Sequence, residues 1–426
     1  MNIHIKNGRL IDPQNRLDAQ QDVYIAERRI VAIGNAPEGF IADQVIDAAG
    51  LIVMPGLVDL AARLREPGYE YRATLESEMN AAVAGGVTSL ACPPDTDPPL
   101  DEPGLVEMLK RRARVLNQCR VFPIGALTYG LKGVALTEMI ELTEAGCKAF
   151  SQADEPLTDT RVLLRAMQYA ATFGYRVWLR PQDSFLAKNG VAHDGEVATR
   201  LGLPSIPVVA ETIALATALQ LARETGVMLH ICRISSAEGV ALLRAAKREG
   251  LTVTCDVSMN HVHLTEMDIG FFDSNCHLVP PLRSGRDRAA LRAGLLDGTI
   301  DAVCSNHSPV DDDAKLLPFA EAEAGATGLE LLLPLVLKWA EQEHVPLLDA
   351  LASITIKPAQ LLGQKMGQLS IGAHADICIF DPKAAWQVAP AALKSQGKNT
   401  PFNGYEMLGR VCYTLLDGRM VYSSLN

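Results

Sequence analysis

The sequence predicts an α/β protein, a (β/α)8 barrel joined to a small β-sandwich that both chain ends build. Its 426 residues suit one barrel of about 250 residues or more plus an accessory unit. Apolar strand-like runs alternate with helical periodicity through the middle of the chain, and short strands with glycine-rich turns occupy both ends. We therefore expect residues 1–54 and 365–426 to form the sandwich and residues 55–364 to form the barrel.

The two chain ends have the same texture of short apolar runs between turn residues, which is typical of strands. The expected terminal strands cover residues 3–5, 8–13, 22–26, 30–34, 367–372, 375–381 and 410–422. Two strand-rich ends that flank a long middle segment indicate one small β-sandwich assembled from both chain ends.

The middle of the chain contains eight apolar runs of strand length, separated by segments with helical periodicity. The expected strands are 51–60, 87–93, 121–127, 147–152, 175–180, 228–235, 252–258 and 302–308, and the clearest helices are 74–84, 160–172, 207–225 and 237–249. A barrel of eight such units carries its functional residues at the C-terminal ends of the strands. Those ends are therefore where a site is expected.

Composition excludes several classes of function. The chain is 48% hydrophobic and 21% charged, which indicates a compact folded protein, and its net charge of -11 disfavours a nucleic-acid partner or an anionic membrane. The nine cysteines form no Cys-x-x-Cys pair and are expected to be reduced. Without a signal-like N-terminus or an apolar run of about 20 residues, the expected location is the cytoplasm.

Six sequence blocks follow one another along the chain, and together they are specific although each alone is a weak motif. They are Pro55 to Leu60, Arg65 to Gly68, Ala84 to Thr88, Pro280 to Ser284, Asp297 to Asp301 and Gly372 to Asp376. In this order they resemble the dihydroorotase branch of the amidohydrolase superfamily over essentially the whole chain. The resemblance implies the same barrel with a flanking β-sandwich.

The resemblance also implies metal ligands at the ends of the first, fourth, fifth, sixth and eighth strands. The residues at those places here are Ala61, Arg63, Gln152, Ala153, Arg180, Arg233 and Asn306. A methyl group has no donor atom, a guanidinium is permanently cationic, and an amide cannot act as a general base. We therefore expect a lost zinc site, with no metal, no cofactor and no catalytic residue, in a protein that is not an enzyme.

Three arginines at the former ligand places, Arg63, Arg180 and Arg233, have two interpretations. In the favoured one they fill the vacated space and pair with nearby carboxylates, since buried charges must be paired. The expected partners are Asp59, Asp95, Asp154 and Asp183, although Asp154, one residue out of place, is expected to point elsewhere. In the other interpretation an anion binds to a set of cationic side chains, namely Arg63, Arg65, Arg180, Arg233 and His307. His230 and Cys232 are interpreted as core residues.

The chain resembles most closely the non-catalytic dihydroorotase-like proteins that accompany aspartate carbamoyltransferase in some bacteria. That resemblance implies a structural subunit in de novo pyrimidine biosynthesis. Its partner would be the catalytic chain of aspartate carbamoyltransferase, and it would form a homodimer within a larger hetero-oligomer. Two alternatives stay open: an anion-sensing regulatory protein that uses the pocket of Arg63, Arg180 and Arg233, and a metal-free cyclic amide hydrolase.

Overall fold

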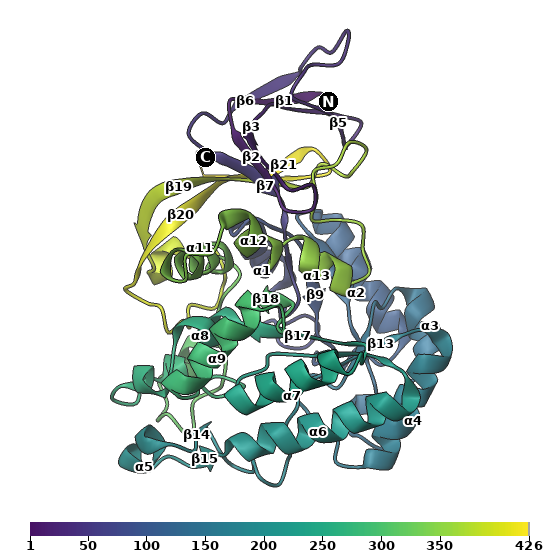
Figure 1. The fold of residues 1–426 in the computed structure, drawn as a ribbon, viewed down its shortest axis with the longest axis vertical. Coiled ribbons are helices and arrows are strands. Elements are labelled where there is room, and N and C mark those ends of the chain that lie inside the picture. Colours follow the sequence, from purple (N-terminus) through teal and green to yellow (C-terminus); the bar gives the residue numbers. More distant parts are fainter. Residues whose placement is uncertain (425–426) are drawn as a thin grey trace.

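The computed structural model describes residues 1–424 and has a parallel eight-stranded barrel at one end and two packed terminal sheets at the other (Figure 1). Both chain ends lie among the terminal sheets. This is the α/β fold that the sequence predicts, and the (β/α)8 expectation is confirmed. No helix among the described residues is both long and apolar enough to cross a bilayer.

The barrel strands follow chain order in two parallel sheets, β10-β9-β8 and β11-β12-β13-β16-β17-β18. Their bounds are β8 Leu57–Asp59, β9 Val87–Cys92, β10 Arg120–Pro123, β11 Gly125–Ala126, β12 Phe150–Ser151, β13 Arg176–Leu179, β16 Met228–Ile231, β17 Val253–Ser258 and β18 Ala302–Cys304. The third barrel strand is interrupted at Ile124, which separates β10 from β11. A parallel bridge between Ala62 and His307 brings the first and last strands together, so the barrel closes.

Helices surround the barrel, and local sequence sets several of their ends. They are α1 Leu75–Ala84, α2 Pro103–Leu116, α3 Met139–Ala145, α4 Thr160–Phe173, α5 Glu196–Leu201, α6 Val208–Thr225, α7 Ala237–Arg248, α8 Met259–His263, α9 Gly285–Leu296, α10 Asp312–Lys315, α11 Leu332–Gln342, α12 Leu347–Ala352 and α13 Ile356–Leu361. Thr74 and Ser284 begin α1 and α9 with capping boxes, which satisfy backbone N–H groups at the helix starts. All four helices expected from periodicity are confirmed within a few residues.

Strands from both chain ends build the terminal sheets. One sheet has the order β21-β20-β19-β7-β2-β3 and the other β5-β4-β1-β6. Their strands are β1 Ile3–Lys6, β2 Arg9–Asp12, β3 Leu17–Gln20, β4 Val23–Ala26, β5 Arg29–Ile33, β6 Gln44–Asp47, β7 Ile52–Pro55, β19 Ile377–Gln387, β20 Glu406–Leu416 and β21 Arg419–Ser423. A shared core, with Ile5 and Ile25 from one end and Ile377 and Leu415 from the other, joins the ends. The predicted strand 51–60 is thus two strands, β7 in a terminal sheet and β8 in the barrel.

Candidate functional site

Five charged side chains gather at the C-terminal ends of the barrel strands, and we name them the mouth cluster. They are Arg63 after β8, Asp95 after β9, Asp154 after β12, Arg180 after β13 and Arg233 after β16. Loops after parallel barrel strands all open at one face, which explains how residues so far apart in the chain meet.

Asp154 lies at the centre of the mouth cluster. Its Oδ2 accepts a hydrogen bond from Arg63 Nη2 at 2.6 Å, and its Oδ1 accepts one from Arg180 Nε at 2.6 Å and another from Arg233 Nη2. Arg63 Nε also donates to Asp95 Oδ2 at 2.6 Å. The expectation that Asp154 points elsewhere is therefore wrong. Ala153 adopts a left-handed conformation with φ of 52°, and this turn directs the next residue back to the mouth.

The three arginines of the cluster hold the Asp154 carboxylate ionised. Burial alone would raise the pKa of Asp154, but Arg233, Arg63 and Arg180 outweigh that effect and hold it well below its usual range. Burial opposes the charge of Arg63, and Asp95 and Asp154 more than compensate, so its pKa is raised. Burial outweighs Asp154 at Arg180, whose pKa is lowered, so the carboxylates compensate for burial fully at Arg63 and only in part at Arg180.

The other two carboxylates expected to pair with the arginines have different partners. Asp59 accepts hydrogen bonds from Ser305 N at 2.8 Å and Ser305 Oγ at 2.6 Å. Asp183 accepts from the backbone N–H groups of Phe185 and Leu186 in its own loop. The paired-arginine interpretation is right for Asp95 and Asp154 and wrong for Asp59 and Asp183.

A pocket of about 260 Å³ opens beside the mouth cluster, with Arg63, Arg65 and Arg72 in its wall. Arg65 has no carboxylate partner among the residues that the structure describes: its Nε donates to Pro309 O and its Nη2 to Ser308 Oγ, both at 2.9 Å. Burial, and then the charge of Arg63, lower its pKa to about 10. Four guanidinium groups, those of the cluster and Arg65, thus face two carboxylates, which leaves two positive charges in excess.

The predicted anion-binding residues do not all reach this pocket. Arg63 and Arg65 line it, Arg180 lines a second pocket with Gln152, and the buried Arg233 lines neither of these two pockets. His307 is fully buried: its Nε2 bonds Glu78 Oε2 at 2.6 Å, and its Nδ1 accepts from Gly328 N at 3.1 Å. His307 therefore supports the barrel closure and does not face the pocket. Arg72, whose loop position carried no sequence signal, takes its place in the pocket wall.

The residues at the family's usual ligand places do not fit a divalent metal. Guanidinium groups occupy three of them, and Ala61 offers no donor. Gln152 is engaged with Thr128 Oγ1 at 2.9 Å, while Asn306 Oδ1 accepts from Arg233 Nη1 at 3.0 Å. We derive no chemical step through a metal at these places.

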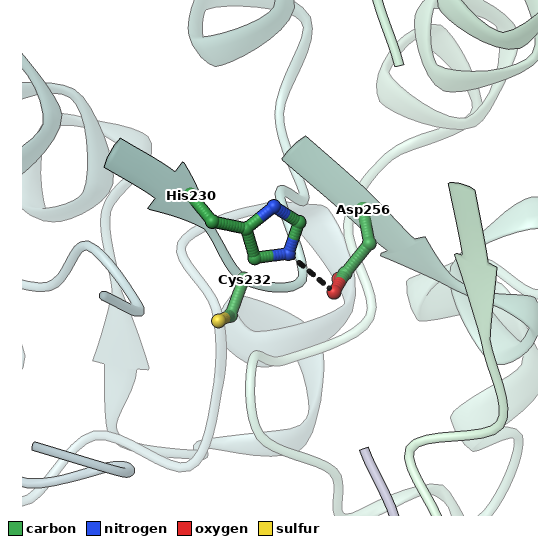
Figure 2. Close-up of side chains that lie close together, drawn as sticks. All are labelled: His230, Cys232 and Asp256. Atoms are coloured by element: carbon green, nitrogen blue, oxygen red, sulfur yellow. Dashed lines mark hydrogen bonds and ion pairs between the residues drawn. The ribbon is translucent and has the colours of Figure 1, made fainter. Parts of the chain in front are cut away.

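Within residues 1–424, a different group of donors lies deeper in the barrel (Figure 2). His230 on β16, Cys232 just after it and Asp256 on β17 offer one nitrogen, one sulfur and one oxygen atom, all within 4.8 Å of one another. The His230 ring faces Asp256, with Nε2 3.0 Å from Oδ2, while Nδ1 lies 2.9 Å from Thr254 Oγ1. Asp256 Oδ1 also accepts from the Arg233 backbone N–H at 2.6 Å.

These three side chains match the donor types that zinc takes in proteins. Burial, followed by the charge of Asp256, raises the pKa of the Cys232 thiol well above 9.0, so a bound cation would have to displace that proton. The sequence interpretation of His230 and Cys232 as core residues missed this grouping. The spacing of two residues between His230, on a predicted strand, and Cys232 is the signal that could have found it, because such spacing in extended chain places both side chains on the same face.

The barrel and the terminal sheets have the fold of the amidohydrolase superfamily. Family models match at residues 50–239, described as dihydro-orotase-like, and at residues 335–422, described as amidohydrolase family. In fold the chain is similar to the L-hydantoinase (dihydropyrimidinase) from Arthrobacter aurescens, with a TM-score of 0.88, 24% identity and coverage of 99% of this chain and 96% of the other.

Relatives that match over almost the whole chain show which family of amidohydrolases it belongs to. A dihydroorotase-like protein of Pseudomonas aeruginosa is 44% identical over 99% of this chain and 100% of the relative. A dihydroorotase of a Geobacter species, strain M21, is 41% identical over 100% of both chains. This chain belongs to the dihydroorotase-like family of amidohydrolases.

These comparisons correct two expectations. The prediction that the chain is not an enzyme is contradicted, because relatives about 40% identical over the whole chain are named dihydroorotase and no comparison indicates loss of catalysis. The prediction of no metal and no cofactor is contradicted as well. Zinc is typical of this family, and His230, Cys232 and Asp256 form a possible metal-binding triad. The error came from judging the chemistry by the usual ligand places alone.

Proposed function

We propose that this protein is a dihydroorotase-family subunit that assembles with the catalytic chain of aspartate carbamoyltransferase in pyrimidine biosynthesis. The mouth cluster is the observation that carries the proposal. Ion pairs tie together the ends of five barrel strands, so the face that is usually built of mobile loops becomes a rigid surface suited to support a partner. We further propose a homodimer within that larger assembly.

Co-expression with the transcarbamoylase chain of the same organism tests this proposal. We expect one co-eluting complex by size-exclusion chromatography with light scattering, and a transcarbamoylase that needs this protein for full activity. An unrelated barrel protein at equal concentration is the control. A transcarbamoylase that assembles and works fully by itself refutes the assembly role.

Hydrolysis of a cyclic amide is the second candidate, favoured by the name of the Geobacter relative and by the state of Arg65. A buried guanidinium without a carboxylate partner is suited to hold the carboxylate of a substrate. Assays with dihydroorotate and with carbamoyl aspartate, with and without added zinc, should show turnover that falls in R65Q. The exposed-site variant R111Q should keep it. A rate equal to the protein-free blank in every assay removes this candidate.

Binding of a regulatory anion is the third candidate function, and the excess positive charge in the pocket at the mouth supports it. Phosphate, carbamoyl aspartate and nucleotides should then stabilise the wild type but not R65Q in a thermal-shift series. Equal responses from the two proteins exclude anion sensing at this pocket.

A further inference from the structure

A second cavity, of about 530 Å³, lies at the opposite end of the barrel, and we name it the basal cavity. Its wall contains residues at the N-terminal ends of three strands, with Arg176 beginning β13, Met228 beginning β16 and Thr252 just before β17. The helix α13 supplies Lys357, Gln360 and Leu361 as the opposite wall. Its volume falls within the range of about 300 to 1,000 Å³ that is common for small-molecule sites.

The barrel interior explains why space remains here. Strand register places Arg176 beside Met228 and Trp178 beside His230, and the period of two directs all four side chains inward. Bulky branched residues normally fill such layers, whereas this interior contains Ala91, Ala149 and Ala302. These small side chains fill less of the barrel interior than bulky branched residues would.

The charges of the basal cavity favour an anion. Among residues 1–424, the side chains of Arg176 and Lys357 form no hydrogen bond or ion pair with the protein. The carboxylate in the wall, Asp301, is already neutralised by Lys247 at 2.6 Å. Two unpaired cations at one concave site attract a phosphate or a carboxylate, and Arg176 can bind either through two parallel hydrogen bonds.

The remaining wall favours an apolar body attached to that anion. Trp178, Leu229 and Leu361 present apolar surface to the cavity, while Thr252 and Gln360 present polar groups. The Trp178 side chain is buried, and within the described part of the chain its indole N–H has no hydrogen-bond partner. A buried donor without a partner is uncommon, and an acceptor atom on a bound ligand would satisfy it.

We propose that the basal cavity is a second ligand site, separate from the mouth, for a small organic anion with a phosphate or carboxylate group on a flat apolar body. Arg176 and Lys357 hold the charged group, and Trp178 and Leu361 contact the apolar part. This site does not depend on the partner or the reaction proposed for the mouth.

Isothermal titration of the whole protein with phenyl phosphate, benzoate and inorganic phosphate tests the proposal and separates the possible charged groups. We expect saturable binding of phenyl phosphate or benzoate, with inorganic phosphate weaker. R176Q/K357Q should bind at least about tenfold more weakly, since each charge-assisted hydrogen bond contributes about that factor or more. The control R111Q/K383Q removes the same charge from two exposed positions and should bind like the wild type.

R65Q, altered at the mouth, should also bind these probes unchanged, which distinguishes the two ends of the barrel. If R176Q/K357Q does not fold, Q360W fills the cavity from the exposed side of α13 and should abolish binding. The proposal is overturned if no probe binds saturably up to the millimolar range, or if R176Q/K357Q binds as well as R111Q/K383Q.

Discussion

Replacing Asp154 by asparagine tests whether the mouth cluster stabilises the fold. The substitution keeps the size of the side chain but removes the charge that three guanidinium groups share. Breaking a buried ion pair from one side costs about 3 to 5 kcal/mol. Because the Asp154 side chain is 28% exposed, the lower figure of about 3 kcal/mol applies.

The expected shift in melting temperature follows from the size of the chain. An unfolding entropy of about 2.1 cal/mol/K per residue over a chain of this length gives about 0.9 kcal/mol/K, so D154N should melt about 3 °C lower. Differential scanning calorimetry measures this shift. D312N, which removes an exposed carboxylate, is the matched control and should melt within about 0.5 °C of the wild type.

The pH dependence gives an independent readout. The folded pKa of Asp154 is depressed, so its stabilising effect is complete above the unfolded value of 3.8 and is lost as the pH falls from there towards the folded value. The difference in melting temperature between the wild type and D154N should therefore be constant near neutral pH and should decrease in acid. If D154N and D312N have the same melting temperature at neutral pH, the reasoning is refuted.

Three further predictions concern other parts of the site. E78Q should lower the free energy of unfolding by about 3 kcal/mol in urea titrations, because Glu78 and His307 are both fully buried and paired; a loss below about 1 kcal/mol contradicts this. Cobalt(II) added to metal-free protein should bind more tightly as pH rises and give a thiolate absorption band that is absent in C232S but present in C119S; a band in C232S assigns the metal elsewhere. Anion affinity at the mouth should fall at least about tenfold in R65Q, which removes a guanidinium that donates only to Pro309 O and Ser308 Oγ, and an unchanged affinity contradicts that role.

The barrel could be predicted because the sequence signals that mark its strands and helices lie within or next to each element. Apolar runs, turn residues and helix caps such as Thr74 and Ser284 mark strands and helices whatever their neighbours are. The convergence of Arg63, Arg180 and Arg233 was predictable as well, since strand ends in a barrel share one face.

The pairing within the site could not be predicted in the same way. Asp154 reaches the arginines only because Ala153 takes a left-handed conformation, and a single alanine carries no signal for that. Asp256 joins His230 across two strands, which requires the register of β16 and β17. The basal cavity is lined by residues of β13, β16, the start of β17 and α13 that lie far apart in the sequence, so no sequence motif predicts it.

His230 also links the two ends of the barrel. Thr254, in the wall of the basal cavity, bonds one ring nitrogen; Asp256 bonds the other and also holds the backbone of Arg233 at the mouth. A substitution of Thr254 at the base thus affects His230, and through it Asp256, which binds the backbone of Arg233 at the mouth. Among homologous sequences, substitutions at positions 230, 254 and 256 should therefore occur together. Substitutions at the base of the barrel should also be accompanied by substitutions at position 233 at the mouth.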